Sequence, residues 1–312
     1  MKVYTHPEHF RNVTRPIITT GTFDGVHQGH LHIIRRLKEI AAVNGGETVV
    51  FTFSPHPRLV LFPDDQKLRL LNTQSEKISL LEKAGVDHLI IYPFTKAFSR
   101  LTAVEYVRDI LVNQLHIHRL VIGYDHQFGR NREGSITNLQ ELAPLYGFEV
   151  EEIPAQMVDD VNVSSTKIRQ SLQEGDIESA NQFLGYSYPL SGIVISGQQI
   201  GRSIGFPTAN IQVTEPLKLI PGDGVYAVKI SHKGKAYGGM LNIGIKPTLE
   251  LEHPNRTLEV NIFDFEGELY NEMIQLEFIA RIREEKKFLN LDQLKLQLHE
   301  DRLTAQKLLL QS

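Results

Sequence analysis

The sequence predicts an α/β domain followed by an all-β domain. Evidence for the first is an alternation of short apolar runs with amphipathic helical patterns, which is typical of a parallel sheet covered by helices on both faces. Evidence for the second is a change of period near Gly185, after which short alternating segments are separated by glycines. We therefore expect a doubly wound, Rossmann-like domain over residues 1–185 and an antiparallel β-barrel with a terminal helix over residues 186–312.

Length and composition are those of a globular protein with two such domains. The chain has 312 residues, 41% of them apolar, which is enough for two packed cores. It contains no cysteine, which excludes disulfides, thiolate metal sites and cysteine nucleophiles. The net charge of −4 disfavours a nucleic-acid partner, and no segment approaches the roughly 20 apolar residues of a membrane span. Because the N-terminus also lacks the apolar core of a secretory signal, we expect a cytoplasmic protein that binds no membrane.

The helices of the first domain have recognisable boundaries, and its strands are short apolar runs. Thr73–Glu76 and Thr102–Glu105 both have the capping-box pattern, and Gly85 is suited to end the first of these helices. Ligands of such sheets bind beyond the carboxyl ends of the strands, so the loops that begin there are candidates for a site. The expected strands are Ile17–Thr20, Thr48–Phe53, His88–Phe94, Leu120–Gly123 and Phe148–Ile153.

A glycine-rich turn, Gly21–His30, joins the first of these strands to an amphipathic helix. Gly25 and Gly29 allow a polyphosphate to approach the backbone closely, and the helix N-terminus directs free N–H groups at it. His27 and His30 can donate hydrogen bonds to the charge that develops when a P–O bond is exchanged. The spacing alone also occurs in surface histidines and metal ligands, but the strand-to-helix position favours a nucleoside triphosphate site.

Three other segments of the first domain carry polar groups near strand ends. Ser54–Pro57 and Gly123–Gly129 should meet the glycine-rich turn in one crevice, although the second is also readable as a simple glycine-bounded loop. Ser164–Arg169 opens a helix. Its Arg169 either binds a triphosphate or is solvated, with the serines acting only as caps.

The second domain has two candidate groups for chemistry. Gly201–Asn210 lacks the Gly-Lys-Ser/Thr ending of a P-loop, so it either binds Mg²⁺ and phosphate through Thr208 and Asn210 or is a structural β-turn. Glu259 alternates with apolar residues on a strand, so it is either a general base or a solvent-facing side chain. The expected strands are Leu190–Ile195, Gly224–Ile230, Lys235–Ile243, Leu258–Phe263 and Ile274–Ile282, and a helix from about Leu291 to Leu309 should pack on them through Leu294, Leu298, Ala305 and Leu308.

Taken together, these segments resemble the bacterial bifunctional riboflavin kinase/FMN adenylyltransferase family, also called FAD synthetase. The resemblance runs nearly from end to end. It implies that ATP phosphorylates riboflavin to FMN in the second domain, that a second ATP adenylylates FMN to FAD with release of pyrophosphate in the first, and that Mg²⁺ serves both reactions. The motifs that carry it are Gly21–His30, Ser164–Arg169, Gly205–Asn210, Asn242–Thr248 and Glu259 with Asp264 and Phe265.

The resemblance also implies roles for individual residues. It implies catalytic roles for Glu259 as the kinase base and for His27, His30 and Arg169 in adenylyl transfer. Thr208 and Asn210 would hold the metal. The residues implied to bind ATP are Gly21, Phe23, Asp24, Gly25, Gly29, Ser164, Thr166, Gly201, Gly205, Thr208 and Asn210. Those implied to contact flavin are Asp125, His56, Arg283 and Phe288.

The sequence departs from the family pattern at three places, and two other functions remain open. His126 and Gln127 stand where the family usually has an aromatic residue and an arginine. Lys246 stands where the family usually has an arginine, and Asn261 stands where it often has a histidine. One alternative is an adenylyltransferase with a different acceptor, which would not need the second domain. The other is a flavin-binding regulator without turnover, which a turnover assay would identify. We expect a monomer or a weak homo-oligomer.

Overall fold

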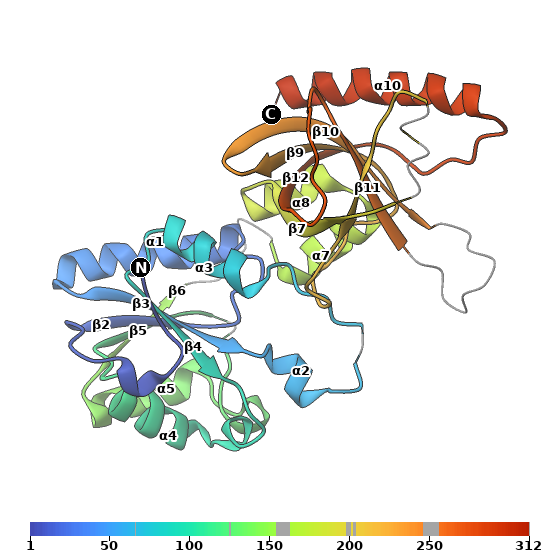
Figure 1. Cartoon of the computed structure of the whole chain (residues 1–312). Helices are drawn as coiled ribbons and strands as arrows, with labels where there is room; N and C mark the ends of the chain where they lie inside the picture. Colours follow the sequence, from blue (N-terminus) through green and yellow to red (C-terminus); the bar gives the residue numbers. More distant parts are fainter. Residues whose placement is uncertain are drawn as a thin grey trace. The chain divides into compact units, whose positions relative to one another are not determined.

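The computed structural model of the chain describes residues 1–65, 67–124, 126–153, 163–197, 201, 204–245 and 256–311. The chain divides into two units, Met1–Ser164 and Ser165–Ser312 (Figure 1). The first is an α/β unit and the second is a barrel with a terminal helix, so the predicted fold class is confirmed. Among the described residues, none of the helices combines the length and the apolar character that crossing a membrane requires.

The first unit is built on a six-stranded parallel sheet in the order β1-β4-β3-β2-β5-β6. Each predicted strand is present to within one residue at either end, and only the short edge strand β1 was not predicted. The order reverses between β2 and β5, the point at which open α/β sheets bind ligands. The strands are β1 (Lys2–Tyr4), β2 (Pro16–Thr20), β3 (Glu47–Ser54), β4 (His88–Pro93), β5 (Arg119–Gly123) and β6 (Glu149–Ile153).

Helices cover both faces of this sheet (Figure 1), because alternate strand residues point to opposite sides. Ile17 and Val50 belong to the cores under α1 and α3, whereas Ile18 and Phe51 belong to the core under η3 and α5. Both predicted capping boxes are present, at the starts of α3 and α4. The helices are η1 (Pro7–His9), α1 (Gln28–Asn44), α2 (Pro57–Leu61), α3 (Gln74–Lys83), η2 (Phe98–Arg100), α4 (Ala103–Glu105), the π-helix η3 (Tyr106–Gln114), η4 (Arg130–Arg132) and α5 (Ile136–Tyr146).

The second unit is a closed antiparallel barrel in the order β10-β11-β8-β7-β12-β9. The segment Gly201–Asn210, which the sequence predicts either to bind Mg²⁺ and phosphate or to be a structural β-turn, ends in the unpredicted strand β8. Asn210 on this strand pairs with Ile195 on one side and with Glu259 on the other. The strands are β7 (Tyr188–Ile195), β8 (Ala209–Gln212), β9 (Gly224–His232), β10 (Lys235–Ile245), β11 (Arg256–Ile262) and β12 (Met273–Arg283).

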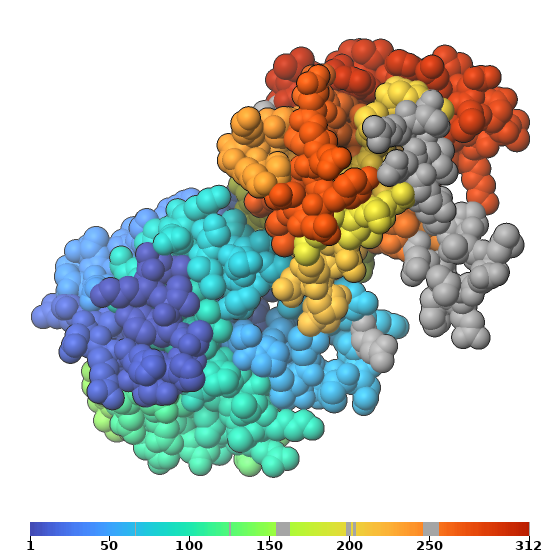
Figure 2. Space-filling view, in the orientation of Figure 1, coloured from blue at the N-terminus to red at the C-terminus, as the bar shows by residue number. Residues whose placement is uncertain are grey.

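The terminal helix α10 (Leu291–Leu310) lies along the outside of the barrel and forms part of the surface of the second unit (Figures 1 and 2). Leu298, Ala305 and Leu308 pack there with Val225 and Met240, as predicted. Leu294, the fourth residue of the predicted apolar stripe, lines a cavity of this unit instead. The helix therefore closes one side of the barrel core.

Two further helices, α7 (Ser165–Glu174) and α8 (Ile177–Leu184), also pack on the barrel. Asn181 donates a hydrogen bond of 2.8 Å to the Phe278 carbonyl, and the N–H of Gly222 donates one of 2.8 Å to the Leu172 carbonyl. These contacts group both helices with the second unit. The domain boundary predicted at residue 185 rests on the change of sequence pattern and not on these contacts. It remains a prediction.

Candidate active sites

A cavity of about 1320 Å³ lies at the carboxyl end of the sheet in the first unit. Thr20 and Gly21 line it at the end of β2, and Gly123 lines it at the end of β5, so it occupies the reversal of strand order. The three loops expected to meet here all contribute. Their lining residues are Gly21, Thr22, Phe23 and His30, then His56 and Pro57, then His126, Gln127, Phe128 and Gly129.

The glycine-rich turn has a backbone that few residue types adopt freely. Three of its residues have positive φ, with 47° at Phe23, 91° at Gly25 and 35° at Val26. Gly25 meets this requirement without strain, whereas the other two need support from their surroundings. At Gly29, a Cβ would lie 3.3 Å from the His27 ring, so glycine leaves room for that imidazole.

The two histidines of the turn form a stacked pair. Their ring centroids are 3.7 Å apart with an angle of 19° between the planes, and the Phe23 ring lies 4.9 Å from His30. Burial, together with the charges of His27 and Lys77, holds the pKa of His30 well below its usual value. His30 is therefore uncharged at neutral pH, and a neutral imidazole still donates one N–H.

Asp24 does not line the cavity. Its side chain is 2% exposed, and Oδ1 accepts hydrogen bonds from the N–H groups of Leu71 (2.9 Å) and Asn72 (3.4 Å). The carboxylate therefore connects the turn to the segment before α3. Of the other predicted residues, Asp125 lies outside the described part of the chain.

Ser164, Thr166 and Arg169, which the sequence assigns to the same nucleotide site, flank the division between the units. Ser164 ends the first unit, and the other two lie on α7 of the second. Their contribution to the site remains a prediction.

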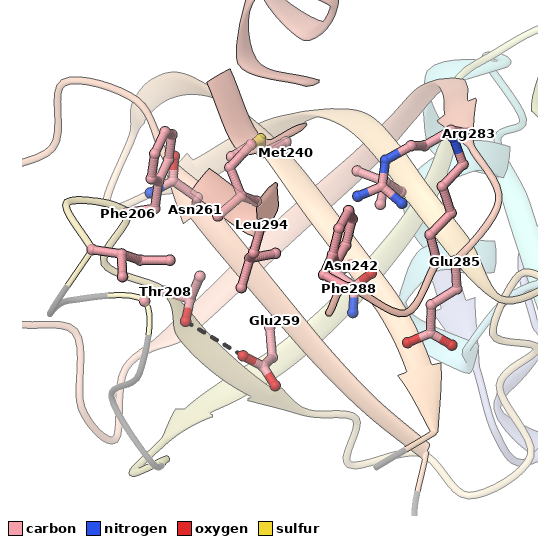
Figure 3. A pocket seen from close by; sticks show the side chains of 15 residues that line it. Phe206, Thr208, Met240, Asn242, Glu259, Asn261, Arg283, Glu285, Phe288 and Leu294 are labelled. Carbon is pink, nitrogen blue, oxygen red and sulfur yellow. Dashed lines mark hydrogen bonds between the residues drawn. The ribbon is translucent and has the colours of Figure 1, made fainter. Parts of the chain in front are cut away.

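A second cavity, of about 280 Å³, lies in the barrel unit (Figure 3). The Thr208 hydroxyl donates to Glu259 Oε2 at 3.5 Å, and both side chains line the cavity. Leu258 and Val260 on the same strand are buried on the opposite face, as alternation predicts. Asn210 is the register partner of Glu259 in the neighbouring strand.

The turn before β8 is fixed by hydrogen bonds. The amide of Asn261, which is 5% exposed, donates to the Pro207 carbonyl at 2.7 Å and so holds the residue next to Thr208. The Phe206 N–H donates to the Gly201 carbonyl at 2.8 Å, and Gly205 has a φ of 88°. Gly201 lines the cavity. Lys246, one of the departures from the family pattern, lies outside the described residues.

Arg283 and Phe288 lie together at another part of this cavity (Figure 3). The guanidinium of Arg283 lies 5.7 Å from the centre of the Phe288 ring. It also donates to both carboxylate oxygens of Asp301 on α10, at 2.9 Å from Nε and 2.8 Å from Nη2. Asp301 is 1% exposed, so a buried carboxylate from the terminal helix orients this cavity residue.

Both units match known families. Residues 10–167 match the family model of FAD synthetase, and residues 184–309 match that of riboflavin kinase. A protein from Listeria monocytogenes named bifunctional riboflavin kinase/FMN adenylyltransferase is 40% identical over 91% of this chain and 90% of its own. One of the same name from Bacillus subtilis is 37% identical over 96% and 95% of the two chains. This chain belongs to the bifunctional riboflavin kinase/FMN adenylyltransferase family.

The resemblance found in the sequence is thereby confirmed, and the chain is a riboflavin kinase and an FAD synthetase. Riboflavin, ATP, FMN and FAD fit these activities, and ATP-using enzymes of these two classes usually need a divalent metal ion. A crystal structure from Streptococcus pneumoniae, described as a macrolide-efflux protein, has a TM-score of 0.87 and 30% identity over 97% of this chain and 98% of that chain.

The sequence did not identify several residues that line the cavity of the first unit. They include four aromatic residues and four arginines, so the replacement of an arginine by Gln127 does not leave the cavity without positive charge. These groups come from several elements that are separate in the sequence, and no motif spacing joins them. The aromatic residues are Phe53, Phe94, Phe98 and Tyr106, and the arginines are Arg58, Arg100, Arg130 and Arg132.

Proposed function

We propose that each activity has its own site: the cavity of the first unit adenylylates FMN and the barrel cavity phosphorylates riboflavin. The separate family matches over residues 10–167 and 184–309 support this division. The observation that carries the kinase assignment is the pairing of Thr208 with Glu259 in the barrel cavity.

In the kinase reaction, Glu259 acts as the general base. Its carboxylate takes the proton from the ribityl 5′-hydroxyl of riboflavin, and that oxygen attacks the γ-phosphorus of ATP while the bond to the bridging oxygen breaks and ADP leaves. Arg283 and Phe288 bind the flavin. The contact of 3.5 Å between Thr208 and Glu259 supports this proposal, because it brings a phosphate-binding turn next to the base.

Thr208 and Asn210 fit a Mg²⁺ site that forms together with ATP. Hydroxyl and amide oxygens are suitable ligands for this ion. Thr208 precedes β8 and contacts Glu259, and Asn210 on β8 is the register partner of Glu259. In the described part of the chain, no cluster of three or more His, Cys, Asp or Glu side chains is arranged to bind a metal. The ATP phosphates would therefore supply further ligands. When bound, Mg²⁺ offsets the phosphate charge, and Gly201 and Gly205 let the turn approach the nucleotide.

In the adenylyl site, His27 and His30 donate hydrogen bonds to the triphosphate of ATP. A phosphate oxygen of FMN attacks the α-phosphorus, and pyrophosphate leaves with the electrons of the broken P–O bond. Ser164, Thr166 and Arg169 add donors to the triphosphate, and His56 and Asp125 contact the flavin. The stacked imidazoles at the start of α1 and the aromatic side chains that line the cavity support this proposal.

The remaining proposals concern the chain as a whole. We propose a domain boundary at residue 185, a cytoplasmic location, where ATP is available to both reactions, and a monomer or weak homo-oligomer.

The substitution Glu259→Gln tests the kinase assignment. It keeps the size of the side chain and removes its ability to accept a proton, so riboflavin phosphorylation should fall by about 10²–10⁴. Adenylylation of supplied FMN should be unchanged. Glu277→Gln is the matched control, because Glu277 lies on β12 of the same barrel and does not line the cavity. A Glu259→Gln chain that phosphorylates riboflavin within about threefold of wild type would show that Glu259 is not the base.

A further inference from the structure

A buried lysine supports the glycine-rich turn from a distant helix. Lys77 on α3 is 7% exposed, although lysine is rarely buried unless its charge has a partner. Its Nζ donates a hydrogen bond of 2.8 Å to the backbone carbonyl of Thr22, inside the turn. The same carbonyl accepts a bond of 3.1 Å from the Thr52 hydroxyl on β3. None of the roles proposed above uses this lysine.

Asp24 provides a second connection between the turn and the same region. Its carboxylate accepts the Leu71 N–H just before α3, while Lys77 binds Thr22. The two attachments therefore lie on either side of Phe23, whose φ is 47°. A non-glycine residue with positive φ is strained, and this conformation persists only where its surroundings fix it.

The charge of Lys77 acts on the same turn. The groups that face His30 are the Phe23 ring, the His27 imidazole and the Lys77 ammonium, and Asp24 is the carboxylate that faces Lys77. A proton on His30 would place a charge 3.7 Å from the centre of the other imidazole and near a buried ammonium. Burial and both neighbours therefore oppose this protonation.

We propose that Lys77 is a positioning residue of the adenylyl-transfer site: it holds the turn in the conformation that stacks His27 on His30. Its ammonium adds to burial and to the charge of His27 in opposing protonation of His30. This inference rests on the proposed role of His30. An uncharged His30 donates its N–H to the triphosphate without repelling His27, and the pair is oriented before ATP arrives.

Lys77→Met tests the positioning role. We expect kcat for FMN adenylylation to fall at least about tenfold, because small displacements of catalytic groups are costly, while KM for ATP changes by less than about threefold. Riboflavin phosphorylation by the same chain should be unchanged and controls for the amount of active protein, while circular dichroism and thermal melting check that the first unit is folded. Lys83→Met is the matched control, because Lys83 is exposed on the same helix. An adenylylation rate equal to that of Lys83→Met would overturn the proposal.

The absence of cysteine from the chain allows a sharper test that does not depend on how Lys77→Met folds. Lys77→Cys can be alkylated in denaturant and refolded, either with an aminoethyl group, which restores an ammonium, or with a propyl group, which has nearly the same shape without charge. The proposal predicts that only the aminoethyl form recovers adenylylation. Equal recovery by both forms would show that the position only needs to be filled.

Titration of the His30 imidazole by NMR separates a positioning role from a merely structural one. Because removal of a nearby positive charge favours protonation, the pKa of His30 should be higher in the propyl form than in the aminoethyl form. An identical pKa in the two forms would contradict the proposal. His30→Ala measured in parallel separates this inference from the assignment on which it rests: a fully active His30→Ala chain refutes the role of His30 itself.

Discussion

Asp301→Asn should weaken the attachment of the terminal helix and, at the same time, the positioning of Arg283 in the barrel cavity. The change replaces a carboxylate that is 1% exposed and accepts bonds of 2.8 to 3.1 Å from Arg283. Breaking a buried ion pair by altering one partner costs about 3–5 kcal/mol. Because the Arg283 side chain retains 13% exposure, water can partly compensate, and we expect a loss near the lower limit, about 3 kcal/mol.

Asp264→Asn is the matched control for this substitution. Asp264 pairs with Arg302 of the same helix at 3.2 Å, but its side chain is 86% exposed. Exposed pairs contribute less than about 1 kcal/mol, so this change should hardly affect unfolding. Asparagine also tolerates the φ of 53° at this position.

Urea denaturation followed by circular dichroism measures the stability, and initial rates at varied riboflavin measure the site. Asp301→Asn should lower the midpoint of the barrel transition and raise KM for riboflavin, since Arg283 is no longer held beside Phe288. Adenylylation of FMN should not change. Equal stability losses in the two variants, or an unchanged KM for riboflavin in Asp301→Asn, would refute the reasoning.

Four other changes give distinct outcomes. His27→Ala should reduce FMN adenylylation by about 10²–10³ and leave riboflavin phosphorylation intact, and an equal loss of both rates in a folded chain would contradict two separate sites. Gly29→Ala places a methyl group 3.3 Å from the His27 ring, so it should slow adenylylation less than His27→Ala, and an unchanged rate would show that the ring can shift freely. A chain beginning at Tyr186 should make FMN but no FAD. A chain beginning at Ser165 should melt at a higher temperature than the chain beginning at Tyr186, because α7 and α8 pack on the barrel. Equal melting temperatures of the two chains would show that these helices add no stability.

Most of the fold follows from local pattern, and the unpredicted strands are those too short to have one. Strands of five residues or more show apolar runs or alternation, as in β3 and β12. β1 has three residues and β8 has four, so neither shows enough alternation to be recognised. Their positions depend on pairing with strands elsewhere in the chain.

The candidate sites were only partly predictable for a related reason. His27, His30, Thr208 and Glu259 lie in motifs with characteristic neighbours. Lys77 acts on Thr22 across 55 positions, and Asp301 acts on Arg283 from another element. Asp24 illustrates the same limit, because its motif suggests a nucleotide ligand while its contacts attach the turn to the segment before α3.

The most direct test of two independent sites is a mixing experiment with His30→Ala and Glu259→Gln, in which flavins made from riboflavin and ATP are separated by chromatography. Alone, His30→Ala should accumulate FMN without FAD, and Glu259→Gln should leave riboflavin largely unconverted while still turning supplied FMN into FAD. Mixed together, the two chains should produce FAD from riboflavin, because one supplies the FMN that the other adenylylates. A mixture that makes no FAD, or a single substitution that abolishes both reactions in a folded chain, would contradict the account.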